Sequence, residues 1–137
     1  MKYTIEGFNQ EKALELNLDL KDLHILRWIL DFQPNMKKEI IDNKEYCWIN
    51  YDYLIKDVPI IGIDNKRALA RRLDKLCNID LLSKKVIKNK LGTYTYFTVN
   101  EKIGCLTHKT EKYNNAQDSK VQPKIILLIM NLLIIHI

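Results

Sequence analysis

The chain has 137 residues, of which 47% are hydrophobic and 28% are charged, and its formal net charge is +5. A soluble domain of this size can bury an ordinary core, so neither disulfides nor a structural metal is required. Residues 64–90 hold 9 of the 22 lysines and arginines but only three acidic residues. The other 110 residues hold 13 basic and 14 acidic ones, so the positive charge is local and favours a polyanionic partner.

The cysteines and the N-terminus show no pattern typical of a metal site, a disulfide framework or a signal peptide. Cys47, Cys77 and Cys105 lie about thirty residues apart, a spacing that suggests neither a zinc site nor a disulfide framework. Residues 1–7 lack the apolar segment of a signal peptide. We therefore expect reduced thiols, a cytoplasmic protein, and no bound metal or cofactor.

Polar residues at N-cap positions predict the helices in chain order. Asn9, Asp19 and Asn50 each precede a stretch with helical spacing of apolar residues, and Asp22 can complete a capping box with Asp19. Pro34 and Pro59 end the second and third helices. The predicted helices are 10–16, 20–33, 51–57 and 65–79.

Alternating and β-branched residues predict the strands. Residues 37–50 suggest a hairpin, whose second arm, 45–49, leads directly into a helix. Residues 81–87 and 93–99 form the arms of a second hairpin, joined by a five-residue turn over 88–92. The strand at 45–49 can pair with these two arms. We therefore expect a three-stranded antiparallel sheet that covers one side of the helices.

The helix predicted over 65–79 divides into two faces. At 100° per residue, Leu69, Leu73 and Leu76 form one apolar stripe, which we expect to be buried. A basic stripe lies nearly opposite, and we expect it to be exposed. Its members are Arg67, Arg71 and Lys75.

The order of elements predicts an α+β fold, a winged helix-turn-helix with one extra N-terminal helix. We assign the domain to residues 1–103 and a polar linker to 104–123. Residues 124–137 form a short apolar tail, too short to span a bilayer alone. It could be a membrane or partner-binding segment, an element packed on the domain, or a product of truncation or frameshift; we favour the last because the tail lacks clean periodicity.

No catalytic constellation is recognisable, and we expect a binding protein rather than an enzyme. A basic helix and hairpin suit double-stranded DNA, with the helix in the major groove and the hairpin on the flanking phosphates. The alternative is a solvated helix face, which Asp74 favours because it shares the face of Arg67 and Arg71. The candidate DNA-binding residues are Lys66, Arg67, Arg71, Arg72, Lys75, Lys84, Lys85, Lys88 and Lys90.

Five sequence blocks resemble the N-terminal winged-helix domain of phage- and prophage-type replication initiator (replisome organiser) proteins of Gram-positive bacteria. The blocks are 3–12 (YTIEGFNQEK), 48–54 (WINYDYL), 57–63 (DVPIIGI), 71–76 (RRLDKL) and 92–97 (GTYTYF). The resemblance covers about residues 3–103, and Asp80 stands where the family usually has a glycine. It implies DNA binding in replication initiation and recruitment of a helicase or its loader.

Other functions fit the same residues. A winged-helix transcriptional repressor would have the same fold, and a protein-interaction module would use the basic helix to dock an acidic partner. A single winged helix offers a small footprint on DNA, so a homodimer paired through the extra N-terminal helix is a further alternative. We expect no membrane partner.

Overall fold

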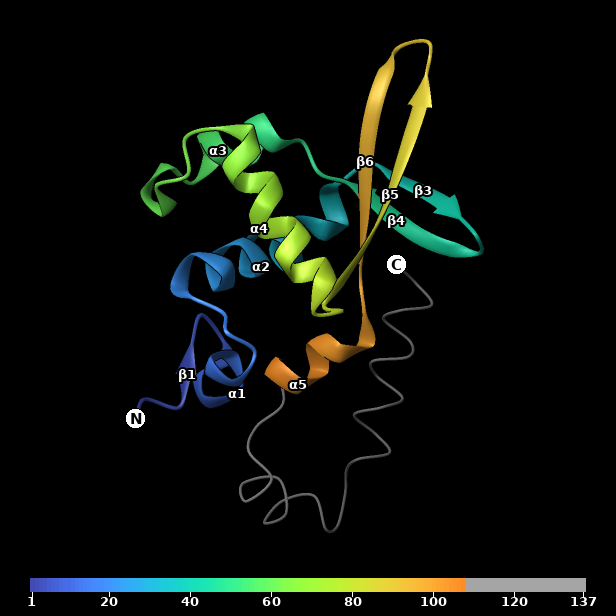
Figure 1. The fold of residues 1–137 in the computed structure, drawn as a ribbon. Helices are drawn as coiled ribbons and strands as arrows, with labels where there is room; N and C mark the ends of the chain where they lie inside the picture. The colour runs from blue at the N-terminus through green and yellow to red at the C-terminus, as the bar shows by residue number, and fades with distance from the viewer. Residues whose placement is uncertain (108–137) are drawn as a thin grey trace.

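The computed structural model describes residues 1–107, in which helices pack against one face of an antiparallel sheet (Figure 1). The chain is therefore α+β, as the sequence predicts. The core combines helical leucines with Ile49 and Phe97 from the sheet side. The main helices are α1 (Gln10–Glu15), α2 (Leu20–Phe32), α3 (Tyr51–Asp57) and α4 (Lys66–Asn78).

All four predicted helices are confirmed, and each begins after a polar cap. The side chains of Asn9, Asn50 and Asn65 accept hydrogen bonds from backbone N–H groups three residues further on. Asp19 and Asp22 form the predicted capping box, with distances of 2.9 and 3.0 Å. These bonds satisfy N–H groups that a helix terminus otherwise leaves unpaired, which fixes where each helix starts.

The sheet has four strands rather than the three that we expected. Its order is β3-β4-β6-β5, and every neighbouring pair is antiparallel. The predicted pairing of β4 with the second hairpin is confirmed, and β3 adds an outer strand. Asp42 and Asn43 turn the chain between β3 and β4 with left-handed φ of 53° and 64°, which Asp and Asn adopt more readily than most residues. The strands are β3 (Lys38–Ile41), β4 (Lys44–Trp48), β5 (Leu82–Asn89) and β6 (Gly92–Val99).

The hairpin of β5 and β6 is longer and its turn tighter than the sequence suggested. Asn89 pairs with Gly92, so only Lys90 and Leu91 form the turn instead of the five residues expected. The Asn89 side chain accepts a hydrogen bond of 2.8 Å from the N–H of Leu91. Figure 1 shows this hairpin projecting well beyond the helices. Its distal half is therefore free to contact a partner.

A small N-terminal hairpin, β1 (Thr4–Ile5) with β2 (Phe8–Asn9), was not predicted. Its strands of two residues are too short to show alternation. Glu6 and Gly7 make the turn with positive φ of 55° and 81°, which suits a two-residue hairpin loop. The hairpin places Phe8 in the core with no exposed surface.

The fold continues past residue 103, where the sequence suggested that the domain ends. After the single turn η3 (Glu101–Ile103), α5 (Gly104–Thr107) lies beside α1 and buries Leu106 completely (Figure 1). Two further short 3-10 turns are η1 (Gln33–Asn35) and η2 (Pro59–Ile61). The rest of the predicted linker and the apolar tail at 124–137 lie outside the described residues. None of the helices within 1–107 is long and apolar enough to cross a membrane.

Candidate nucleic-acid interface

The apolar stripe of α4 anchors the candidate interface to the core. Leu69, Leu73 and Leu76 are fully buried, as predicted. Arg67 and Arg71 lie on the exposed side of the same helix, which is also as predicted. Packing of the three leucines fixes the rotation of α4 about its own axis. The two arginines, on the other side of the helix, therefore point to solvent.

A buried carboxylate on α2 holds two of the predicted DNA-binding residues. Asp22 is completely buried, and it accepts hydrogen bonds from Arg72 Nη1 at 2.9 Å and Lys75 Nζ at 2.6 Å. Arg72 Nη1 also bonds to Asp19 Oδ1 at 2.7 Å. A buried charge needs such partners, because desolvation is expensive when a charge is left unpaired. We call these four residues, Asp19, Asp22, Arg72 and Lys75, the α2–α4 ion network.

The expectation that Lys75 shares an exposed stripe with Arg67 and Arg71 is wrong. Lys75 is half-buried and reaches back to Asp22, because its long flexible side chain extends from the border of the helix face to a neighbouring helix. Asp22 itself was assigned only a capping role. Its second role could not be inferred without knowing that the N-terminus of α2 lies against the middle of α4.

The Asp19–Arg72 pair of the α2–α4 ion network remains charged at neutral pH. Burial raises the pKa of Asp19, but hydrogen bonds from Arg72 and from the Asp22 backbone, together with the charge of Arg72, lower it to about 2. The hydrogen bond to Asp19 raises the pKa of Arg72. The main role of Arg72 is therefore structural. If Arg72 bound a phosphate instead, the buried carboxylate of Asp22 would lose one of its two cationic partners.

Three other predicted lysines form ion pairs on the exposed surface. Pairs of this kind contribute about 0 to 1 kcal/mol, so each lysine can exchange its carboxylate for a phosphate at low cost. The pair of Lys84 with Asp74 also joins β5 to α4. The pairs are Lys66 with Asp52 at 3.0 Å, Lys84 with Asp74 at 2.6 Å, and Lys85 with Asp42 at 3.2 Å.

Four of the nine predicted residues have no carboxylate within ion-pair distance among residues 1–107. They are exposed, and they belong to α4 and to the distal part of the β5–β6 hairpin. Residues 81–100 contain four lysines and no acidic residue. Among the predicted DNA-binding residues, the positive charge without an acidic partner therefore lies on one helix face and one hairpin. The four residues are Arg67, Arg71, Lys88 and Lys90.

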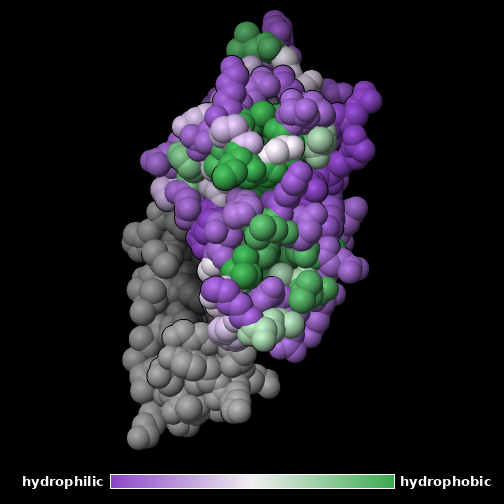
Figure 2. All heavy atoms as spheres, turned by 90° about the vertical axis from the view of Figure 1, so that its left-hand side faces the viewer, coloured by the Kyte–Doolittle hydropathy of each residue, from purple (hydrophilic) through white to green (hydrophobic). Residues whose placement is uncertain are grey.

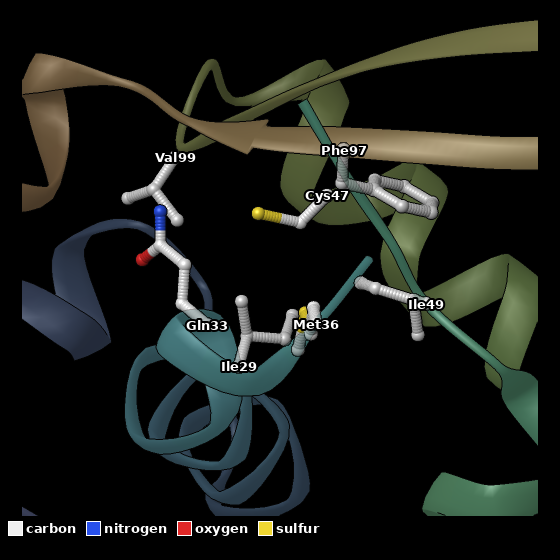
Figure 3. Close-up of a pocket in the computed structure, with 7 residues that line it drawn as sticks. All are labelled: Ile29, Gln33, Met36, Cys47, Ile49, Phe97 and Val99. Carbon is white, nitrogen blue, oxygen red and sulfur yellow. The ribbon is translucent and has the colours of Figure 1, made fainter. Parts of the chain in front are cut away.

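A small cavity between α2 and the sheet does not offer a site for a ligand. Figure 3 shows the Cys47 thiol pointing into it, between Ile29 and Val99. Its volume of about 10 Å³ is close to the lower limit for one water molecule. Burial raises the pKa of the Cys47 thiol, so this cysteine is suited to packing. Residues 1–107 also contain no group of three His, Cys, Asp or Glu residues that could hold a metal ion.

The surface on the opposite side from the sheet is mixed. Figure 2 shows hydrophobic patches on this side, separated by hydrophilic side chains. The most exposed large hydrophobic residue among those described is Ile60, at 93%, in the connection between α3 and α4.

Comparisons with protein-family models, with curated proteins and with solved structures found no match. The resemblance seen in the sequence therefore gains no support from these comparisons. A functional assignment has to depend on the charge and geometry of α4 and the β5–β6 hairpin.

Proposed function

We propose that the chain is a double-stranded DNA-binding module of the winged helix-turn-helix class. In this proposal α4 enters the major groove and the β5–β6 hairpin is the wing on the flanking backbone. An α-helix is about 10–12 Å across and the major groove is about 12 Å wide, so α4 fits. The succession of α3, α4 and a hairpin that pairs with β4 supports this class.

The observation that carries the proposal is the pair Arg67 and Arg71. Both are exposed on the side of α4 opposite the buried leucines, and neither forms an ion pair with a described residue. Arginine is the side chain best suited to donate to O6 and N7 of guanine. Asp74 lies on the same side, but it is bound to Lys84, which weakens its competition for the two arginines.

The biological role within this proposal is the initiation of phage or prophage DNA replication. Its support is the resemblance of residues 3–103 to such initiators, and recruitment of a helicase or its loader is part of the same proposal. A winged-helix transcriptional repressor would use the same surface. A binding site mapped to an origin favours the first role, and one mapped to a promoter favours the second.

Fluorescence anisotropy with a random duplex tests DNA binding, at about 50 and about 200 mM salt. We expect wild-type affinity to fall steeply with salt and the Arg67→Ala/Arg71→Ala variant to bind more weakly by about 1 to 3 kcal/mol for each lost base contact. The control Lys37→Ala/Lys44→Ala removes two exposed charges, one just before β3 and one at the start of β4, and should change affinity little.

Two outcomes would contradict the proposal. Equal affinity of the wild type and the arginine variant would remove α4 from the interface. No affinity for the duplex at the lower salt concentration would instead favour the protein-interaction module, in which the basic helix docks an acidic partner.

A further inference from the structure

The tip of the β5–β6 hairpin carries an apolar side chain in a basic setting. Leu91 is 85% exposed, and it lies in the two-residue turn next to Lys90. Lys88 and Lys90 have no carboxylate partner among the described residues, and the hairpin itself contains no acidic residue. Single exposed leucines are common on protein surfaces, so exposure alone would mean little. The position of Leu91 at the end of a basic hairpin is what distinguishes it.

The local structure holds this side chain at the tip. The Asn89 side chain accepts a hydrogen bond of 2.8 Å from the N–H of Leu91, and β5 pairs with β6 along its whole length. The tip lies beyond the N-terminal end of α4 (Figure 1). Leu91 therefore extends from an ordered support, which reduces the entropy lost when it enters a partner.

We propose that Leu91 enters the DNA minor groove and inserts between adjacent base pairs, next to the major-groove site of α4. This rests on the proposed DNA-binding function. Strands of eight residues extend about 26 Å, which exceeds the roughly 17 Å of half a helical turn between neighbouring grooves. Leucine is among the side chains that proteins insert at base steps from the minor groove, and Lys88 and Lys90 would hold the phosphates on either side.

Insertion at a base step makes the hairpin sensitive to DNA flexibility. Pyrimidine–purine steps such as TA unstack easily, whereas A-tracts are stiff. The residue would thus contribute a preference for flexible steps without forming a hydrogen bond to any base. A purely electrostatic wing would show no preference for flexible steps, because phosphates carry the same charge at every step, and the narrow minor groove of an A-tract would instead attract its lysines.

Two duplexes of the same composition test the inference. One alternates A and T, so that every second step is TA, and the other pairs a run of A with a run of T; each is about three helical turns, roughly 30 base pairs. A 2-aminopurine base in each reports unstacking by a rise in fluorescence. The wild type should bind the alternating duplex more tightly and raise its fluorescence.

Leu91→Ser should weaken binding to the alternating duplex by about tenfold and abolish both the preference and the fluorescence rise. Leu14→Ser is the matched control, because Leu14 is 55% exposed on α1, at the opposite end of the molecule from the hairpin tip (Figure 1). It should behave as the wild type, and both variants should keep the thermal stability of the wild type.

The result separates the inference from the proposed function. Duplex binding by the wild type with no preference between the duplexes, or with a preference and a fluorescence rise that Leu91→Ser retains, would overturn the inference alone. Failure of the wild type to bind these duplexes and the random duplex at low salt would overturn the proposed function and the inference with it.

Discussion

The two sides of α4 use the same kind of residue for different purposes. On the side that borders the core, Arg72 and Lys75 are bound to the buried carboxylate of Asp22. On the outer side, Arg67 and Arg71 have no acidic partner among the described residues. Adjacent arginines thus differ in role because an acid on α2 reaches only one side. The number of basic residues on a helix therefore overstates the charge that it can offer to DNA.

The largest effect should come from removing the acid on the inner side. Asp22→Ala leaves Arg72 and Lys75 without their buried acceptor and also removes half of the capping box. We expect the free energy of unfolding to fall by about 3 to 5 kcal/mol, measured by urea denaturation. Asp52→Ala breaks only the exposed pair with Lys66 and should cost about 1 kcal/mol or less. Similar losses of unfolding free energy in the two variants would show that the buried network stabilises the fold no more than an exposed ion pair does.

On the outer side of α4, a substitution should weaken DNA binding more than it lowers the stability of the fold. Arg71→Ala should weaken binding to a selected DNA site by about 1 to 3 kcal/mol if Arg71 contacts a base, while the free energy of unfolding changes by less than about 0.5 kcal/mol. Anisotropy titrations and urea denaturation measure the two quantities. A large loss of stability with unchanged affinity would reverse the roles that we assign to the two sides.

A smaller effect is expected at the hairpin. Lys88 lacks a carboxylate partner within the described chain, so Lys88→Ala should lower the slope of log affinity against log salt by about one unit and leave sequence preference unchanged. Lys84→Ala is a useful comparison because Lys84 is paired with Asp74. A change in preference caused by Lys88→Ala would mean that Lys88 contacts a base rather than a phosphate.

The smallest effect concerns acid pH. The pKa of Asp19 is lowered in the folded protein from 3.8 to about 2, so its ion pair with Arg72 stabilises the fold above about pH 3.8 and is lost as the pH falls toward 2. The Asp19 side chain is 54% exposed, and solvent screening keeps the gain small. Asp19→Asn should flatten the fall in stability over this range in urea denaturation. If Asp19→Asn left the dependence of stability on pH unchanged, the stabilising role assigned to the Asp19–Arg72 pair would be contradicted.

Much of the fold could be predicted because its signals are local. The N-caps Asn9, Asp19 and Asn50 define helix starts from one side chain and a few following residues. The leucine stripe of α4 follows from helical geometry alone. The exit from α4 is also local: Asp80 has a left-handed φ of 68°, a conformation that Asp adopts more readily than most residues.

What could not be predicted depends on contacts between distant segments. The hydrogen bond from Lys75 to Asp22 joins residues that are 53 positions apart, and the periodicity of neither helix predicts it. Helix α5 is four residues long and is held by the burial of Leu106 against the N-terminal part of the chain, so its sequence looked like the start of a linker. The basic residues of α4 could thus be named from the sequence, but dividing them into ion-paired and exposed cations required the structure.

The most direct test of the account follows the arginine side chains of α4 while duplex DNA is added. Their Nε–H resonances can be observed one by one in isotope-labelled protein by nuclear magnetic resonance. We predict that the resonances of Arg67 and Arg71 shift as the duplex binds, while that of Arg72 stays with Asp19 and Asp22 and changes little. A large shift of Arg72 with Arg67 and Arg71 unchanged would contradict the account.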